Sequence, residues 1–442
     1  PQNYEKYLSF SLGGLVFKDT CQFMAGKLES LSENFGGETP ITRAEISDLP
    51  ELVRPLLLEK GEFPYQWFNS FERFDETALP PASDFHSDLT GDDIKPVDYA
   101  RAQEVWRLGQ CRTFADYHDL YLRTDVALLA DVFETFRDLM REKHGLDPAH
   151  YLTAPGMAWD AMLKLTGVEL EILTDMEQHL FVERGIRGGI CQVSHRAARA
   201  NNPLAEATGG AVYDPSKPRT WLAYQDMNNL YGGAMCMALP TSGFAWAPVG
   251  ELEAEHARLM ARHDDDPRGA FYEVDLAYPD ELHDLHNDYP LAPEVGTITT
   301  ADLSPWARDL AEARYSSRKL LLTLRDKKRY VLHERNLREY LRQGLVLTAV
   351  HRVLEFDQSA WMAPWIQKNT DFRRHARNKF EEDFYKLLNN SVFGKTMESV
   401  RKRVDIQLVR ATEEKERERY RKMVAKPTFA GRKIFDESLI AV

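Results

Sequence analysis

The sequence predicts a mixed α/β protein with several domains, and three observations support this fold class. The 442 residues include 43% apolar and 11% aromatic side chains, which is enough for two or three large cores. An apolar run over residues 8–17 is expected to form strands, and the residues after it, through Leu31, have the pattern of an amphipathic helix. Residues 112–140 carry an apolar stripe at helical spacing, whereas residues 345–356 are expected to be strands.

The charge is unevenly distributed along the chain. The formal net charge is −13, which argues against a protein that simply coats nucleic acid. Residues 314–342, in contrast, hold ten basic and three acidic side chains. We expect this segment to be helical, and its charge fits either a solvated helical face or a surface that contacts DNA or a primer.

Cysteines and apolar segments exclude several classes of protein. The four cysteines are far apart and form no C-x2-C pair, so we expect reduced thiols and neither a zinc site nor a disulfide framework. No apolar run approaches the ~18 residues of a membrane span, and no signal peptide is visible. We therefore expect a soluble chain without a membrane partner.

The stretch from Phe384 to Lys395 is the most informative part of the sequence. Residues 371–398 contain no Pro and one Gly, which predicts one long helix. At 100° per residue, one side of this helix is apolar, and a different side presents polar and aromatic groups within about 60° of one another. The apolar side consists of Phe380, Phe384, Leu387 and Leu388, and the other side of Lys379, Lys386, Asn390 and Phe393.

The polar side has the groups that a nucleotide site needs. Cations bind phosphates, a ring can stack on a base, and Gly394 lets another backbone approach closely. The structural alternative is a solvated helix with incidental lysines. The order K-x3-N-S-x-F-G-K, from Lys386 to Lys395, resembles the fingers-helix motif of family B DNA polymerases. The nearest match is the protein-primed branch of adenoviruses, terminal-protein phages and Polinton/Maverick elements.

This resemblance implies roles for individual residues of the helix. Lys379, Lys386, Asn390 and Phe393 would bind the incoming nucleotide. Gly394 and Lys395 would contact DNA.

A second motif follows an expected strand over residues 221–225, where D-x2-N-L-Y begins at Asp226. It resembles polymerase motif A, and an isolated turn is the structural alternative. The resemblance implies that Asp226 is catalytic and binds two Mg²⁺ ions, for which Mn²⁺ could substitute, with the carbonyl of Met227 as a further ligand. The backbone amides of Asn229 and Leu230 would hold the triphosphate. Tyr231 would exclude a 2′-hydroxyl, and Gly232 stands where the family often has Pro.

A third motif lies within the expected helix over residues 112–140. Tyr121 and Asp125 are spaced i, i+4 and therefore share a face. With the sequence V-A-L-L-A-D-V-F after Asp125, this Y-x3-D pair resembles the third motif of proofreading exonucleases. The resemblance implies a catalytic phenol at Tyr121 and a catalytic, metal-binding carboxylate at Asp125. Asp19 is a weaker candidate for catalysis, and the two carboxylate motifs that precede Y-x3-D in the family are not found.

A fourth motif, at Arg187, Gly188 and Gly189, resembles the Y-x-G-G link between exonuclease and polymerase domains, where template DNA approaches the backbone. Ile186 stands where the family often has tyrosine.

No D-T-D motif occurs in the sequence. We therefore expect an internal fragment of the polymerase that does not extend primers alone.

The resemblance divides the chain into an exonuclease remainder of the ribonuclease-H-like type and a partial polymerase. The expected segments are 1–150 for the C-terminal part of the exonuclease domain, 151–220 for the link, 221–250 for the palm, 251–365 for an insertion that contacts the priming protein or upstream DNA, 366–398 for the fingers, and 399–442 for the start of a second insertion or of the palm's return.

The expected function is that of a protein-primed DNA polymerase that catalyses two-metal nucleotidyl transfer and, in the intact protein, 3′–5′ proofreading. Expected partners are template-primer DNA, deoxynucleoside triphosphates and a terminal protein, with a monomeric chain. The compartment is undetermined, with the nucleus or a viral replication site favoured.

The alternative is a non-catalytic, nucleic-acid-binding relic of a viral or mobile-element polymerase. A stand-alone nuclease would leave Asp226 and Lys386 without a role.

Overall fold

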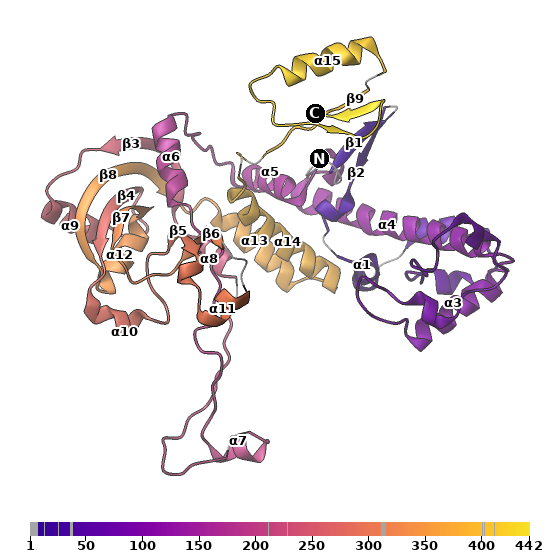
Figure 1. Ribbon diagram of the computed structural model, residues 1–442, viewed down its shortest axis with the longest axis horizontal. Helices are drawn as coiled ribbons and strands as arrows, with labels where there is room; N and C mark the ends of the chain where they lie inside the picture. Colours follow the sequence, from indigo (N-terminus) through magenta and orange to yellow (C-terminus); the bar gives the residue numbers. More distant parts are fainter. Residues whose placement is uncertain are drawn as a thin grey trace. The chain divides into compact units, whose positions relative to one another are not determined.

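The chain forms two compact units, both of which contain helices and strands (Figure 1). The first unit combines Pro1–Gly167 with Pro364–Val442, and the second unit is Val168–Ala363. This confirms the predicted mixed α/β fold class. The computed structural model describes residues 8–12, 14–24, 26–35, 39–210, 212–227, 229–310, 315–399, 401, 403–410 and 412–442.

The N-terminal part of the first unit begins with strands, as predicted for the apolar run, and they form an antiparallel hairpin. The helix predicted to follow, through Leu31, is wrong in extent, because a 3₁₀ turn comes first and the α-helix begins only at Leu28. Helices dominate the rest of this part, and the predicted long helix is present as α4. Its elements are β1 (Ser9–Leu12), β2 (Leu15–Lys18), α1 (Leu28–Phe35), α2 (Pro40–Glu45), α3 (Pro96–Leu108), α4 (Phe114–His144) and α5 (Ala154–Thr166). Short 3₁₀ turns connect them at Thr20–Gln22, Arg54–Leu57, Phe71–Asp75, Ala82–Phe85 and Pro148–His150.

Helix α4 is the longest element of the first unit, and its ends are well defined. Thr113 and Asp116 form a capping box at the N-terminus, and Gly145 ends the helix with φ of 67°. The carboxylate of Asp131, buried in the middle of α4, accepts hydrogen bonds from the backbone amides of Ile41 and Thr42 at 2.9 and 2.8 Å. Asp131 thus binds the start of α2 to α4.

The predicted single helix over residues 371–398 is wrong, because the chain forms two helices there. Helix α13 (Ala363–Arg374) and helix α14 (Lys379–Thr396) are separated by a short break. Asn378 is extended, with φ of −152°, and its side chain accepts a hydrogen bond from the amide of Glu381 at 2.9 Å. This N-cap satisfies a donor that a continuous helix would have bonded internally.

The predicted core face of α14 is confirmed. Phe380, Phe384 and Leu388 are buried, and α14 packs against α5 and α1. The ring of Phe384 meets the ring of Phe136 in α4 edge-on, with centroids 5.2 Å apart. Helix α14 is therefore part of the core of the first unit.

The first unit ends in a small antiparallel sheet with one charged helix. The sheet has three short strands, and the helix lies between the first and the second of them. The elements are β9 (Leu408–Arg410), α15 (Glu414–Val424), β10 (Lys433–Ile434) and β11 (Leu439–Ala441), in the sheet order β10-β11-β9.

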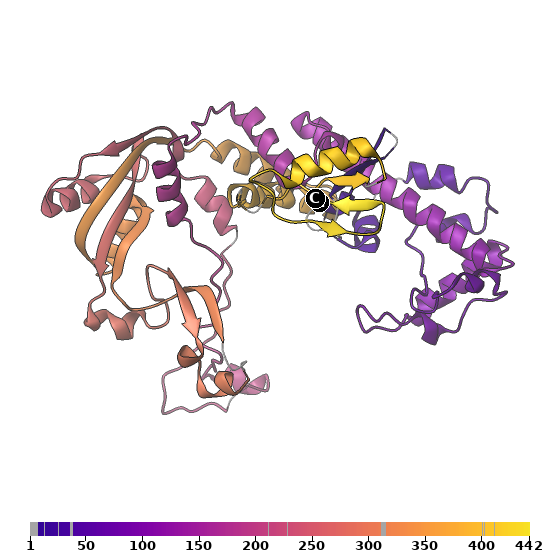
Figure 2. The same cartoon turned by 45° about the horizontal axis from the view of Figure 1, so that its top comes forward.

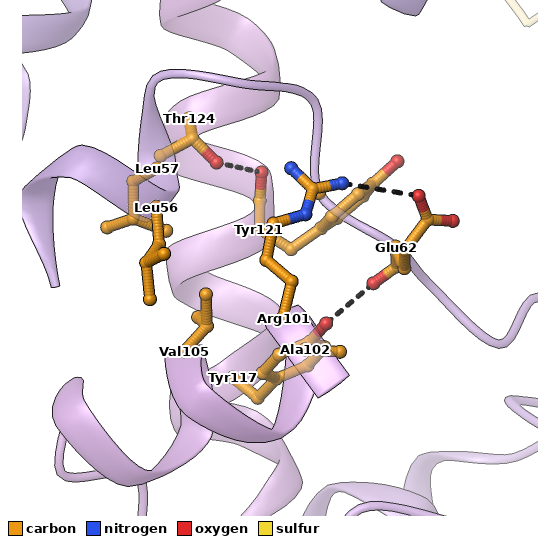
Figure 3. Close-up of a pocket in the computed structure, with 10 residues that line it drawn as sticks. Leu56, Leu57, Glu62, Arg101, Ala102, Val105, Tyr117, Tyr121 and Thr124 are labelled. Carbon is orange, nitrogen blue, oxygen red and sulfur yellow. Dashed lines mark hydrogen bonds and ion pairs between the residues drawn. The ribbon is translucent and has the colours of Figure 1, made fainter. Parts of the chain in front are cut away.

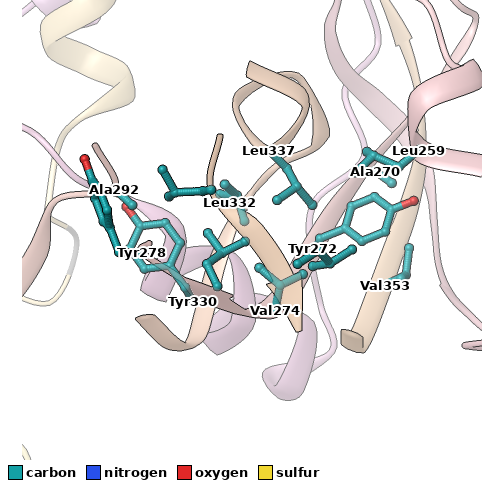
Figure 4. Packing of buried hydrophobic residues seen from close by; sticks show 13 residues of the cluster. Leu259, Ala270, Tyr272, Val274, Tyr278, Ala292, Tyr330, Leu332, Leu337 and Val353 are labelled. Carbon is teal, nitrogen blue, oxygen red and sulfur yellow. The ribbon is translucent and has the colours of Figure 1, made fainter. Parts of the chain in front are cut away.

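The second unit is built on a four-stranded antiparallel sheet of order β3-β8-β4-β7 (Figure 2). Side chains alternate between its faces. One face packs against α9 and α12 through Tyr272 and Val274 (Figure 4), and the other packs against Phe181 of α6. The elements are α6 (Met176–Gly185), β3 (Leu239–Ala247), α9 (Leu252–Ala261), β4 (Arg268–Ala277), β7 (Lys327–His333), α12 (Glu334–Arg342) and β8 (Val346–Ser359).

The basic segment of residues 314–342 is not mainly helical, so that prediction is wrong. Its described part forms strands β6 and β7 before α12, because alternating side chains such as Tyr330 and Leu332 enter the sheet core. The remaining elements of the second unit are short. They are α7 (Pro203–Ala207), α8 (Leu230–Met235), α10 (His283–His286), β5 (Glu294–Thr299), α11 (Pro305–Leu310) and β6 (Ser316–Leu321), with 3₁₀ turns at Asp280–Leu282 and Thr300–Asp302.

Among the residues that the structure describes, we find no helix with the length and apolar character that a membrane span requires.

Candidate functional site

Tyr121 and Asp125 lie on one face of α4, where a third residue joins them. The phenol of Tyr121 donates to Oδ2 of Asp125 at 3.3 Å. Lys60, from the loop before α3, donates through Nζ to the Tyr121 phenol oxygen and to Oδ1 of Asp125, both at 2.8 Å. The phenol of Tyr65 also bonds to that of Tyr121. The result is a compact cluster of two phenols, one carboxylate and one ammonium group.

The environment of this cluster keeps the Tyr121 phenol protonated. Burial raises the pKa of Tyr121, and the hydrogen bond with Tyr65 and the charge of Asp125 raise it further. A neutral phenol remains a hydrogen-bond donor over the whole ordinary pH range. Tyr121 can therefore orient an oxygen, whereas Lys60 supplies a positive charge next to it.

Sequence reasoning found Tyr121 and Asp125 but missed Lys60 and Tyr65. The pair on α4 is visible as an i, i+4 spacing, whereas Lys60 lies in an irregular loop 65 residues before Asp125. Nothing in the local pattern of residues 60–65 indicates which side chain returns to α4. A small cavity beside Tyr121, lined partly by Leu57, adjoins this cluster (Figure 3).

The polar side of α14 is accessible, as predicted. Lys379, Lys386 and Asn390 are exposed, and Phe393 is half-buried. Lys379 already has two acidic neighbours, because its ammonium group lies 3.1 Å from Glu382 and 3.2 Å from Asp383. The nucleotide-binding roles of this side remain predictions.

The DNA-binding role at the end of α14 is also still a prediction. Gly394 is exposed, with open space where a side chain would be. Lys395 pairs with Glu398.

The expected strand before Asp226 is absent, so that prediction is wrong. Residues 221–227 are irregular, and no strand among the described residues pairs with them. Trp221 and Tyr224 are 67% and 99% exposed. A strand requires a partner for its backbone groups and a core for its apolar face, and here the described chain offers neither.

The turn after Asp226 has a defined local structure, and Asn228 lies outside the described residues. Asn229 has φ of 56°, and its Oδ1 accepts a hydrogen bond from the amide of Gly232 at 3.0 Å. A Cβ at position 232 would lie 2.0 Å from Asn229 Nδ2, and proline would also lack the donor. This contact favours glycine at position 232. Leu230 and Tyr231 are exposed at the start of α8.

The described residues do not by themselves fit a two-ion magnesium site. No group of three or more His, Cys, Asp or Glu side chains that could hold an ion occurs among them. Asp226 and Met227 are exposed in an irregular segment. The carboxylate of Asp125 bonds to Lys60 and Tyr121, so a cation already neutralises it. These donors do not match the several oxygen ligands that a pair of magnesium ions requires.

Arg187 packs onto its own unit. Its Nη1 donates to the carbonyl of Val331 at 2.6 Å, and its guanidinium lies 3.7 Å from the ring centroid of Tyr330. Burial lowers the pKa of Arg187. Gly188 and Gly189 are exposed, and Gly189 has φ of 88° with open space around it. The glycines therefore remain accessible, whereas Arg187 has contacts with the sheet.

The N-terminal part of the chain is similar in sequence to a known family of proteins. Residues 6–204 match the family described as DNA polymerase type B, organellar and viral. This segment is therefore similar to that class of enzyme, and it contains Tyr121, Asp125 and Arg187. No curated protein sequence matches the chain.

Two solved structures of Phi29 DNA polymerase match the chain with low similarity. The orthorhombic crystal form of Phi29 DNA polymerase is 13% identical, with a TM-score of 0.41, over 87% of this chain and 49% of that chain. Phi29 DNA polymerase complexed with primer-template DNA and incoming nucleotide substrates is 14% identical, with a TM-score of 0.40, over 86% and 48%. The chain thus spans about half the length of the solved polymerase.

Proposed function

We propose that this chain belongs to a protein-primed family B DNA polymerase with an associated 3′–5′ exonuclease. The observation that carries the proposal is the match of residues 6–204 to type B DNA polymerases of organelles and viruses. The motifs at Asp226 and Lys386 lie outside the matched segment and support the same class independently.

The proposed polymerase would bind template-primer DNA and deoxynucleoside triphosphates. Its first nucleotide would be joined to a hydroxyl of a terminal protein, and later ones to the primer 3′ end. Magnesium is the expected cofactor of the whole protein, and a nuclear or viral replication site is the expected location. The exposed side of α14 would hold the triphosphate through Lys386, and Tyr231 would lie under the sugar.

The exonuclease proposal rests on the cluster around Tyr121. When substrate binds, the neutral phenol would orient the attacking water or a phosphate oxygen by transferring its one donated hydrogen bond from Asp125 to that oxygen. Lys60 can stabilise negative charge that develops on the phosphate, because its ammonium group lies within hydrogen-bond distance of both Tyr121 and Asp125. Asp125 in turn fixes the position of both donors.

Two substitutions in the whole protein separate the two activities. Asp226→Asn should abolish primer extension and leave degradation of an end-labelled, single-stranded oligonucleotide unchanged. Asp125→Asn should do the reverse, because the two carboxylates lie in different units. Binding of the oligonucleotide without either activity, unaffected by both substitutions, would support the alternative of a non-catalytic nucleic-acid-binding relic.

A further inference from the structure

The loop that carries Lys60 is held in place by a residue of α3, which bonds to the backbone of Lys60. We propose that Arg101 is a positioning residue that fixes Lys60 beside Tyr121 and Asp125. This inference rests on the proposed exonuclease function and assigns a residue that no motif of the sequence indicates.

Arg101 contacts the loop at three points. Its Nη2 donates to the backbone carbonyl of Lys60 at 2.8 Å. Its Nη1 lies 3.3 Å from a carboxylate oxygen of Glu59. Its Nη2 lies 3.4 Å from a carboxylate oxygen of Glu62, as Figure 3 shows. The side chain of Arg101 is only 18% exposed, so these contacts are partly shielded from solvent. Arg101 therefore binds the loop on both sides of Lys60.

The other end of the loop is attached to α4. The buried phenol of Tyr117 donates to the carbonyl of Glu62 at 2.7 Å. Gly61 lies against the ring of Tyr121, and a Cβ there would be 3.1 Å from Cδ2 of that ring. A side chain at this position would require the ring to shift by a few tenths of an ångström, so glycine lets the loop come this close without strain. The backbone around Lys60 is thus confined between α3 and α4.

This confinement determines where the Lys60 ammonium group can lie. A lysine side chain has four rotatable bonds and does not hold one position by itself. The ammonium group of Lys60 reaches both Tyr121 and Asp125 because Arg101 fixes the backbone carbonyl of Lys60. Removing the guanidinium would release that carbonyl and two acidic side chains at once. Lys60 would then spend less time at Asp125.

The first test measures Lys60 itself in the 442-residue chain. Acylation of its amine by an N-hydroxysuccinimide acetate, followed by mass spectrometry, should be about tenfold faster in Arg101→Gln, as expected for a lost charged hydrogen bond. Arg107→Gln is the matched control, since Arg107 lies on the same helix, is 65% exposed and pairs with Glu104. The control should acylate Lys60 at the wild-type rate, and Lys95 should react equally in all variants.

The second test measures nuclease activity in the whole protein. Arg101→Gln should lower kcat about tenfold with little change in KM, because substrate binding does not involve the loop backbone. Arg101→Lys should recover part of kcat, since an ammonium group can still donate to the Lys60 carbonyl. If Arg101 only stabilised the fold, Arg101→Gln would not lower kcat while leaving KM unchanged, and Arg101→Lys would not recover part of kcat.

The outcomes separate the inference from the proposed function. If the wild-type protein has no nuclease activity, the proposed exonuclease fails, while faster acylation of Lys60 still supports the positioning. If Arg101→Gln does not fold, Tyr117→Phe replaces it, and a rise of about twofold in Lys60 acylation is expected from one lost hydrogen bond. Acylation of Lys60 in Arg101→Gln at the Arg107→Gln rate, with unchanged kcat, overturns the inference.

Discussion

The ammonium group of Lys60 lies 2.8 Å from a carboxylate oxygen of Asp125, although 65 residues separate the two in the chain. We predict that Lys60→Met lowers the nuclease activity of the whole protein about 100-fold, because a charged donor to the reacting phosphate is lost. Lys95→Met, at an exposed position before α3, should have wild-type activity. Single-turnover degradation of a labelled oligonucleotide measures the effect, and equal rates in the two variants would remove Lys60 from the mechanism.

On α14, Lys386 and Lys379 are exposed, but their surroundings differ. Lys386→Ala in the whole protein should weaken nucleotide use by about 2–4 kcal/mol of transition-state binding, because a triphosphate contact is lost. Lys379→Ala should have a smaller effect, since Glu382 and Asp383 already bind its ammonium group. Steady-state primer extension at varied nucleotide concentration measures both. Weaker template binding with normal KM and kcat for Lys386→Ala would instead indicate contact with the DNA backbone.

The faces of single elements could be predicted from the sequence because each depends on local periodicity. The buried side of α14 and the shared face of Tyr121 and Asp125 follow from about 100° per residue. The break before α14 could not be predicted from the absence of Pro and Gly, because Asn378 caps the helix with its side chain. Capping competes with helix continuation through a few tenths to one kcal/mol, which periodicity does not show.

Features that depend on contacts between distant parts of the chain could not be predicted from the sequence either. The strand expected before Asp226 needed a partner that no described residue provides, and an apolar sequence alone cannot show this. Lys60 was missed for a similar reason, since a loop residue reaches α4 only through contacts made by Arg101 and Tyr117. The nucleotide-binding and metal-binding assignments rest on resemblance and stay predictions.

Tyr231, exposed at the start of α8, is predicted to discriminate against ribonucleotides. It follows Asp226 by five residues, where its ring would lie under the sugar of a bound nucleotide. Tyr231→Val in the whole protein should raise incorporation of ribonucleotides and leave the use of deoxynucleotides largely intact. Primer extension with each nucleotide class gives the ratio of kcat/KM values. An unchanged ratio would contradict the assignment.

The two glycines after Tyr231 provide a matched pair of substitutions. Gly232→Ala should lower nucleotide use in the whole protein, because a Cβ would collide with the Asn229 amide that holds the turn. Gly233→Ala should be tolerated, since nothing lies within 4 Å of a Cβ there. Both variants have the same helix propensity, so the difference between them measures the contact alone. Equal activity in the two variants would mean that the contact between Asn229 and Gly232 does not matter for nucleotide use.

His144, at the end of α4, makes the stability of the first unit depend on pH. Burial and, to a smaller extent, the charge of Lys368 lower the pKa of His144 to about 4. Its ordinary value is 6.5, so below that pH the unfolded chain binds a proton that the folded chain does not. Folding therefore loses stability as pH falls from 6.5 toward 4, by about 2 kcal/mol between about pH 7.5 and pH 5.

Urea denaturation at these two pH values tests the contribution of His144. His144→Gln should remove this part of the pH dependence, although it also lowers stability at both pH values by disturbing the contact with the ring of Trp365, 4.9 Å away. Lys368→Met should give an intermediate pH dependence, because the charge that disfavours the protonated imidazole is lost while the imidazole stays buried. Parallel pH profiles in the wild-type chain and both variants would show that His144 titrates alike in the folded and unfolded chain.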